Sequence, residues 1–248
     1  MNDKVIISLT THSIRLNTVA RTAIFSLLKG TYKNFQIVLT LYKDDVKLIP
    51  NDLQLMIDNG IVELIVAEQD LGPHLKYFYC MKKYRDFPII TVDDDFIYPD
   101  DTIENLVSYY NKFKNSIIAR RTFVINKELN YRKMLNAGIS RIHEPSFLNF
   151  ATGCGGILYP PNILKITDDY ISDILDMKYD DDFYLKALET RLGLKVVSSL
   201  YNKNCDGVFK LVWDEGIQTI ALWNKNIVKS QDNLQKYKKE FEECLKNS

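Results

Sequence analysis

The sequence predicts an α/β fold in which a mostly parallel sheet carries helices on both faces. Short, almost wholly apolar segments alternate with amphipathic segments through the first half of the chain. Strands that are apolar throughout are typical of a parallel sheet, because its strands are buried on both faces. Clusters of Asp residues come shortly after the ends of two of these apolar segments, at Asp44-Asp45 and at Asp93-Asp94-Asp95. The 248 residues are 46% hydrophobic, which is sufficient for a sizeable core.

The first half of the chain gives the clearest elements. We expect strands over Lys4–Leu9, Phe35–Leu41, Val62–Val66 and Pro88–Val92. We expect the intervening helices from about Val19 to Leu28, over Pro50–Asn59 and from about His74 to Tyr84. Ser13 or Asn17 is placed to cap the first helix, and Gly30 and Gly60 follow the ends of the first two. This order of strands and helices favours a parallel sheet.

The second half is less regular. Its expected helices and strands are Asp100–Lys114, Ser116–Ala119, Ile157–Tyr159, a helix directly after Asp180-Asp181-Asp182, Leu194–Ser198 and a C-terminal helix over Gln231–Lys246. Pro160-Pro161 can open a further helix. Arg120 to Asn149 has no clean period, so we expect an irregular or mobile insertion there.

Composition excludes several classes of protein. Lys plus Arg and Asp plus Glu both number 32, so the basic excess of a nucleic-acid-binding protein is missing. The longest apolar runs are far shorter than the roughly 20 residues of a membrane span, and no secretory leader is recognisable. The four cysteines are scattered, which fits reduced thiols in a cytoplasmic protein better than disulfides or a zinc site.

Asp93-Asp94-Asp95 is the strongest chemical signal. These acids repel one another at the carboxyl end of an apolar strand, where α/β sheets bind ligands. A divalent cation that prefers oxygen would offset their charge and still coordinate a diphosphate. Since alternate strand residues share a face, Asp93 and Asp95 should point one way and Asp94 the other. We expect Asp95 to touch the metal and Asp93 to reach it, or a ribose, through water. The alternative is an acidic loop that caps the next helix.

A second acidic cluster, Asp180-Asp181-Asp182, precedes a predicted helix. One Asp would suffice as a cap, so three suggest a carboxylate aimed into a site. That carboxylate would be a general base or would orient an acceptor hydroxyl. Asp181 and Asp182 are equal candidates, and helix capping remains the alternative.

Weaker signals accompany the acids. The glycines of Thr152–Gly156 let a backbone approach a ligand closely, but they form neither a dinucleotide nor a Walker motif. Lys76 is a candidate partner for phosphates, with a solvated helix lysine as the alternative. Arg15 could meet a phosphate or a base. Cys154 has no neighbouring His to activate it, and the three histidines fit structural hydrogen bonds best.

In this order the motifs resemble bacterial GT-A-fold glycosyltransferases. The resemblance rests on IISLTT with a following Arg-bearing helix, an acidic end of the second strand, Asp-x-Gly-Pro-x-x-Lys ending at Lys76, ITVDDD, TGCGGILYPP and DDDFYLKAL. It covers about residues 4 to 200. Each motif is weak alone, and their order is fairly specific.

The resemblance implies a GT-A-like, Rossmann-like sheet with an acceptor-side extension in a single domain over residues 1–248. About residues 1–100 would bind a nucleotide-diphosphate sugar such as a UDP-sugar, and about residues 101–248 would form the acceptor side and the C-terminal helix. Mn²⁺ or Mg²⁺ would bind at Asp93 and Asp95. The implied donor-binding residues are Thr10, Arg15, Asp44, Asp45, Lys76, Asp93, Asp94, Gly155 and Gly156. Asp181 or Asp182 would be the catalytic base of an inverting enzyme.

Two further implications concern the C-terminal part. Many relatives supply another metal ligand there, often His, but no His follows His143; Asn204, Asp206, Asp232 or water could replace it. The implied acceptor is a hydroxyl of a glycan or glycolipid in surface polysaccharide or lipopolysaccharide synthesis. The Lys-rich end of the chain could rest on the inner face of the membrane, although its Glu residues favour a solvated packing helix. The lysines concerned are Lys225, Lys229, Lys236, Lys238, Lys239 and Lys246.

Two other functions fit parts of the sequence. Asp93-x-Asp95 after PIITV imitates an aspartate-nucleophile phosphatase, which suggests phosphoryl or nucleotidyl transfer. That pattern usually has Thr or Val two residues after the second Asp, where this chain has Ile97. It also normally lies on the first strand of its domain, whereas three predicted strands precede it here. A sugar-nucleotide-binding protein without turnover is the other alternative, and the paired acidic clusters argue against it.

Overall fold

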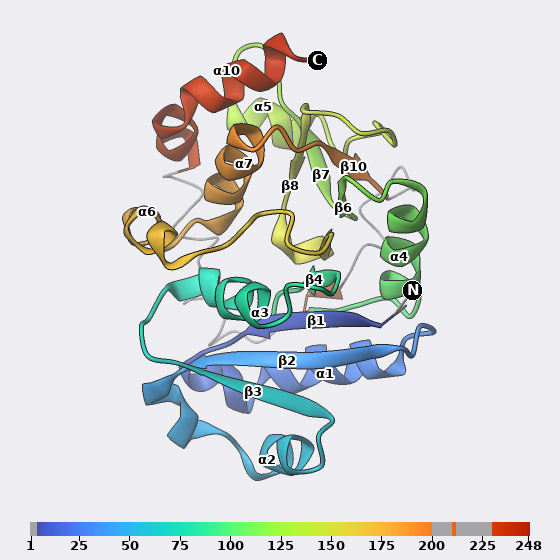
Figure 1. Ribbon diagram of the computed structural model, residues 1–248, viewed down its shortest axis with the longest axis vertical. Coiled ribbons are helices and arrows are strands. Elements are labelled where there is room, and N and C mark those ends of the chain that lie inside the picture. Colours follow the sequence, from blue (N-terminus) through green and yellow to red (C-terminus); the bar gives the residue numbers. More distant parts are fainter. Residues whose placement is uncertain (1–3, 200–209, 212–229) are drawn as a thin grey trace.

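A central sheet organises the protein (Figure 1). The computed structural model describes residues 4–199, 210–211 and 230–248, and within them seven strands form this sheet in the order β10-β6-β9-β4-β1-β2-β3. In chain order the strands are β1 Val5–Thr10, β2 Phe35–Tyr42, β3 Val62–Ala67, β4 Ile89–Thr91, β6 Ile117–Ala119, β9 Ile157–Tyr159 and β10 Val196–Ser198. β9 is antiparallel to both its neighbours, and the other pairings are parallel. The predicted α/β class is therefore confirmed.

Helices and short strands complete the described part. The α-helices are α1 Val19–Lys29, α2 Asn51–Asp58, α3 Phe78–Lys83, α4 Thr102–Lys112, α5 Tyr131–Asn136, α6 Ile171–Asp176, α7 Asp181–Arg191 and α10 Lys238–Lys246. The 3₁₀ helices are η1 Ser13–Asn17, η2 Lys43–Leu48, η3 Gly72–Lys76, η4 Gly153–Gly155 and η5 Asp168–Tyr170. β5 Phe96–Ile97 pairs with β11 Lys210–Leu211, and β7 Thr122–Val124 pairs with β8 Asn149–Ala151.

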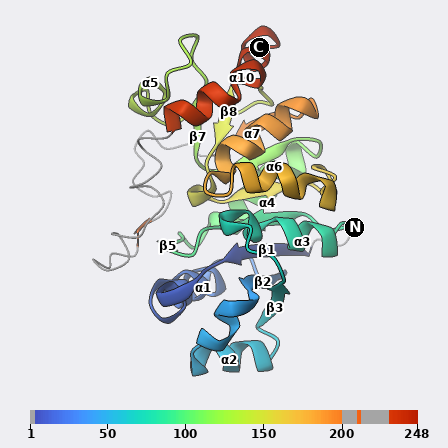
Figure 2. The ribbon, with the colours of Figure 1, turned by 90° about the vertical axis from the view of Figure 1, so that its left-hand side faces the viewer.

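Alternate side chains of each strand enter two separate cores. Val5, Ile7 and Leu9 of β1 pack in the core that α1, α2 and α4 cover, whereas Ile6 joins the opposite core, which contains side chains of α3, α6, α7 and α10. Figure 2 shows α1 and α3 on opposite sides of the strands β1 and β2. Both faces of the sheet are thus buried by helices, which explains why its strands lack polar alternation.

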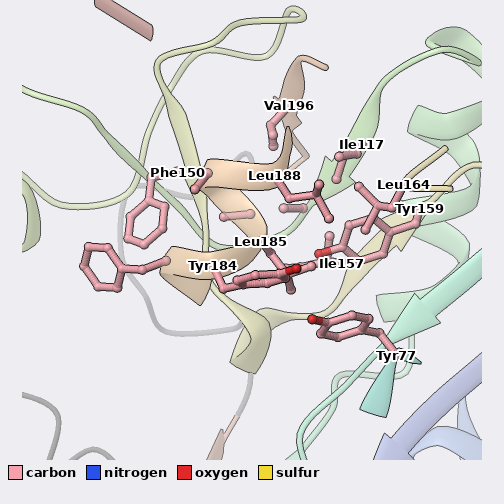
Figure 3. Close-up of a cluster of buried hydrophobic side chains, with 14 of the residues drawn as sticks. Tyr77, Ile117, Phe150, Ile157, Tyr159, Leu164, Tyr184, Leu185, Leu188 and Val196 are labelled. Carbon is pink, nitrogen blue, oxygen red and sulfur yellow. The ribbon is translucent and has the colours of Figure 1, made fainter. Parts of the chain in front are cut away.

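The core on the α7 side joins the two halves of the chain. Figure 3 shows Tyr184, Leu185 and Leu188 of α7 beside Ile157 and Tyr159 of β9. All five side chains are at most 3% exposed. α7 is therefore fixed against the middle of the sheet, and its first turn has a defined position relative to the strand ends.

The C-terminal segment is helical, as predicted, but a turn at Tyr237 divides the single expected helix in two. Residues 230–236 are helical, and α10 follows after a turn at Tyr237 and contacts α7. Leu234, Tyr237 and Phe241 are buried, whereas Leu245 is half-buried. The lysines at 236, 238, 239 and 246 are exposed, and those at 225 and 229 lie outside the described residues. Within the described ranges no helix has both the length and the apolarity that crossing a bilayer requires.

Three local predictions were wrong. The expected insertion between Arg120 and Asn149 contains β7 and α5, whose short lengths leave no detectable period. Pro160-Pro161 opens a turn rather than a helix. Neither Ser13 nor Asn17 caps α1, because both belong to η1 and the cap position is Thr18, which makes no side-chain cap bond.

An acid lies inside the core on α7. Glu189 is 1% exposed, and within the described residues its Oε2 accepts no hydrogen bond. The nearby Nζ of Lys186 lies 3.8 Å from that oxygen. Burial raises the pKa of Glu189 to about 7, and Lys186 opposes that rise only in part.

Replacing Glu189 by Gln should make the stability less dependent on pH. The folded protein holds this proton more tightly than the unfolded chain, so the wild type loses stability as pH rises from about 4.5 through about 7. The full loss is about 3 kcal/mol. Urea denaturation measures the free energy of unfolding of both proteins between pH 4 and pH 8. As pH rises across this range, the stability of Glu189→Gln should increase relative to that of the wild type. A constant difference across this range would contradict the assignment. Glu128→Gln, at a side chain 61% exposed, is the control.

Candidate functional site

The predicted site residues gather at one edge of the sheet. β1, β4 and β6 run in the same direction and end at Thr10, Thr91 and Ala119. Antiparallel β9 begins at Ile157, which pairs with both Thr91 and Ala119. The segments after β1, β4 and β6 and the glycine loop before β9 therefore leave the sheet at the same edge. Ligands of open α/β sheets bind at such an edge.

Arg15 binds two acids of the first cluster. η1 begins three residues after β1 and holds Arg15 at 8% exposure. Its Nε donates to Oδ2 of Asp94 at 2.9 Å, and its Nη2 lies 2.9 Å from Oδ2 of Asp95 and also contacts Asp94. Burial raises the pKa of Asp95 to about 6, although Arg15 favours its charged form.

The predicted alternation of the three acids is wrong. Asp94 and Asp95 both contact Arg15, whereas Asp93 contacts Lys76. The strand β4 ends at Thr91 and the chain turns at residues 94–95, so strand alternation no longer applies there.

Lys76 connects the first acidic cluster to the second. It ends η3, is 5% exposed, and places Nζ 2.8 Å from Oδ1 of Asp93 and 2.7 Å from Oδ2 of Asp181. The alternative of a solvated lysine is thereby excluded. His74 anchors the same turn as a structural histidine. Its Nε2 donates to the carbonyl oxygen of Met177 at 3.0 Å, which leaves Nδ1 to accept from the hydroxyl of Tyr77 at 2.7 Å.

Asp181 and Asp182 lie in the first turn of α7, and only Asp180 precedes the helix, as its N-cap residue. Lys76 holds the pKa of Asp181 below its ordinary value against the effect of burial. Burial and the neighbouring Asp181 raise the pKa of Asp182 well above its ordinary value. Burial also raises the pKa of Asp180 to about 7, while Asn233 donates a hydrogen bond to it. The adjacent Asp181 and Asp182 therefore differ in proton affinity.

Gly153 is a site residue that the sequence analysis missed. Its N–H donates to Oδ1 of Asp182 at 2.9 Å. A methyl group on Gly153 would lie 2.6 Å from Nζ of Lys76 and 3.3 Å from Oδ1 of Asp93. A side chain at residue 153 would therefore displace the ammonium group of Lys76 from its place between the two acidic clusters. The glycine-rich motif was the available signal, but its pattern did not distinguish Gly153 from Gly155.

Arg121 was also missed, because it falls in the segment expected to be irregular. It follows β6 at the same edge as the acids, and its Nη1 donates to Oγ1 of Thr152 at 2.9 Å and to Sγ of Cys154 at 3.3 Å. A methyl group on Gly155 would lie 2.8 Å from the Arg121 backbone nitrogen, so this glycine permits close contact between two chain segments. The predicted strand ending at Ala119 was the signal that could have identified Arg121.

The other predicted residues lie around this cluster. Thr10 donates to the carbonyl oxygen of Thr40 at 2.8 Å and links β1 to β2. Asp45 of η2 accepts a hydrogen bond from the backbone of Ser13 at 3.1 Å, and Asp44 is exposed on the same turn. Gly156 has a φ of +88° directly before β9.

Other predicted side chains contribute little to the cluster. Cys154 is half-buried with a pKa raised to about 11 by burial, so it is not an activated thiol. Asp232 is exposed, and Asn204 and Asp206 lie outside the described residues.

The cluster fits a divalent cation by charge and by ligand type. Its carboxyl groups outnumber its cationic side chains by five to two; the members are Asp93, Asp94, Asp95, Asp181 and Asp182 against Arg15 and Lys76. Carboxylate oxygens suit Mg²⁺ and Mn²⁺, which bind through few protein ligands when phosphates and water supply the rest. Across residues 4–199, 210–211 and 230–248, no three His, Cys, Asp or Glu side chains converge on one ion position. An ion bound at these carboxylates would take its remaining oxygen ligands from a diphosphate or from water.

Comparison with known proteins identifies structural neighbours only. The sequence matches no protein-family model and no curated protein. The fold resembles residues 1–349 of TarS from S. aureus, with a TM-score of 0.51 and 15% identity over 79% of this chain and 57% of that chain. The TarS complex with UDP-GlcNAc gives a TM-score of 0.50 and 13% identity over 83% of this chain and 60% of that chain.

A structure from another organism gives the same result. The mannosyltransferase PcManGT from Pyrobaculum calidifontis, in complex with GDP-Man and Mn²⁺, has a TM-score of 0.50 and 12% identity over 88% of this chain and 59% of that chain. The present chain thus spans about three-fifths of these neighbours. At such low identity the likeness establishes a shared fold, which agrees with the predicted GT-A-like architecture.

Removing the Lys76 charge should destabilise the protein strongly. Lys76→Met leaves the buried carboxylate of Asp181 and the half-buried carboxylate of Asp93 without their cation, at an expected cost of about 3–5 kcal/mol. Chemical denaturation at pH 7.5 measures the change in the free energy of unfolding. Lys133→Met is the control, since Lys133 and its partner Glu128 are each 61% exposed and the pair contributes at most about 1 kcal/mol. Equal effects of the two substitutions would contradict the bridging role of Lys76.

Proposed function

We propose that this chain is a glycosyltransferase. It moves a sugar from a nucleotide-diphosphate sugar, specifically a UDP-sugar, to a hydroxyl group of a glycan or glycolipid. The single observation that carries the proposal is the buried Lys76, which joins the acids after β4 to the acids at the start of α7. The structural neighbours crystallised with UDP-GlcNAc and GDP-Man support the nucleotide-sugar donor.

The arrangement at the sheet edge suits an anionic donor. Arg15 and Lys76 are buried cations placed on either side of the Asp93–Asp95 turn. A bound diphosphate would replace some of the carboxylates that Arg15 and Lys76 now contact. Each cation would then keep an anionic partner. In this proposal Arg15 orients the turn, and Lys76 faces the phosphates.

The second acidic cluster supplies the base. Asp181 stays ionised beside Lys76, whereas Asp182 has the higher proton affinity of the two. A carboxylate of raised pKa accepts a proton more readily, provided that it is ionised when the substrates are bound. We assign Asp182 as the group that takes the proton from the acceptor hydroxyl. Gly153 orients it through the hydrogen bond to Oδ1.

Asp93 and Asp95 would hold Mn²⁺ or Mg²⁺. When bound, such an ion offsets the negative charge that develops on the departing nucleoside diphosphate. The carboxyl of Asp95, four residues after the end of β4, would hold that ion at the sheet edge, and the phosphates would bind there through it. Mn²⁺ in the PcManGT complex supports a divalent cation in this fold.

The proposed acceptor belongs to surface polysaccharide or lipopolysaccharide synthesis at the cytoplasmic face of the membrane. The motif resemblance suggests this setting. The exposed lysines of residues 236–246 offer a surface for contact with anionic lipid.

The purified protein should slowly hydrolyse a nucleotide sugar to free sugar and nucleoside diphosphate. A panel of UDP- and GDP-sugars is screened first by thermal shift, because a ligand that binds only the folded state raises its apparent stability. Chelation should abolish hydrolysis. Asp95→Asn should weaken UDP binding in the presence of Mn²⁺ by at least about tenfold, with the exposed Asp86→Asn as its control.

Each other outcome contradicts part of the proposal. Release of inorganic phosphate would indicate phosphoryl transfer, and tight binding without hydrolysis would indicate a binding protein. Unchanged UDP affinity of Asp95→Asn would contradict the metal assignment alone.

Asp182→Asn should lower the rate of sugar transfer by about 100- to 10,000-fold and leave the donor affinity nearly unchanged, because only the proton acceptor is lost. Asp181→Asn should change donor affinity and stability as well, because Lys76 loses a partner. Transfer rates and UDP dissociation constants are measured for both variants and for Asp173→Asn, an exposed control on α6. Near-normal turnover of Asp182→Asn would refute the assignment of the base.

A further inference from the structure

Arg121 is held rigidly by uncharged groups. Its Nη1 donates to Oγ1 of Thr152 and to Sγ of Cys154, and its guanidinium carbon lies 4.6 Å from the ring centroid of Phe123. Phe123 is itself 3% exposed and therefore gives the guanidinium a fixed platform. These contacts fix the orientation of the head group without offsetting its charge.

The described residues provide Arg121 with no ionic partner. Arg15 pairs with Asp94 and Asp95, and Arg120 pairs with Asp101. No Asp or Glu of residues 4–199, 210–211 or 230–248 lies within ion-pair distance of Arg121, which is half-buried. Both of its hydrogen bonds to these residues come from Nη1, so Nε and Nη2 remain available. That edge of a guanidinium is the fork that binds a carboxylate or a phosphate through two parallel hydrogen bonds.

The glycine loop places this fork close to the proposed base. Gly153, at one end of η4, donates to Asp182 at 2.9 Å, and Gly155, at the other end, is packed against the backbone of Arg121. In contrast, Arg15, on the proposed donor side, contacts the turn after β4. A group bound at Arg121 is therefore near the hydroxyl from which Asp182 takes a proton.

We propose that Arg121 binds an oxyanion of the acceptor, a carboxylate or a phosphate, and so selects acidic acceptors. This inference rests on the proposed function, and it names the substrate class. The carboxylate of an acidic sugar and a phosphate in a glycan or lipid-linked acceptor share the chemistry that the fork recognises. The donor diphosphate is the other anion that this fork could bind. Titrating the UDP-saturated protein distinguishes an acceptor anion from the donor diphosphate.

The test uses the full chain saturated with UDP and titrated with glucose, glucuronic acid or glucose 6-phosphate. In the wild type, at least one of the two charged sugars should bind about 10- to 100-fold more tightly than glucose. Arg121→Gln should remove that preference and leave the UDP affinity unchanged. Arg121→Lys should retain part of the preference, because it keeps the charge but not the fork. Arg132→Gln, at an exposed position of α5, should behave as the wild type.

Three outcomes would overturn the inference. One is equal binding of the three sugars by the wild type, which includes binding of none of them. Another is a preference for the charged sugars that Arg121→Gln retains. The third is a loss of UDP affinity in Arg121→Gln, which would assign the fork to the donor diphosphate. The wild-type comparison does not depend on how well a variant folds. An Arg121-dependent preference without hydrolysis of any nucleotide sugar would refute the proposed function alone, whereas hydrolysis without the preference would refute only this inference.

Discussion

The two ion pairs of the buried Lys76 are the constraint on which the site depends. The lysine comes from a turn after β3, and its partners come from the turn after β4 and from the first residues of α7. Lys76 keeps the deeply buried Asp181 ionised, because burial alone raises the pKa of a carboxyl group. Lys76 thus holds the two acidic segments at a fixed separation and sets which carboxyl carries charge.

Unequal surroundings give chemically identical residues different properties. Asp181 contacts Lys76 and has a lowered pKa, while Asp182 receives one backbone hydrogen bond and has a raised pKa. The same division holds among the arginines at the sheet edge. Arg15 is paired with acids, and Arg121 rests on neutral partners. One edge of the sheet therefore carries an acid of high proton affinity and a cation with open donors.

The glycine loop at residues 153–155 leaves space for the charged side chains to pack closely at the sheet edge. Side chains from four segments meet where β9 enters the sheet, and a methyl group on Gly153 would collide with Lys76. The loop can lie there because β9 runs against its neighbours and begins at the edge where they end. The antiparallel strand is thus a requirement of the site as well as a feature of the sheet.

The sequence alone determined the sheet and most helices, because strands that are buried on both faces are apolar throughout. It also determined the acidic clusters, because adjacent carboxylates repel one another and folding alone does not favour them. It did not determine β7 and α5, which are too short to show a period. Only the tertiary structure decided that Lys76 is buried, that Asp94 turns toward Arg15, and that Asp181 and Asp182 differ. Those properties depend on contacts between residues far apart in the chain, and a local pattern contains no information about such contacts.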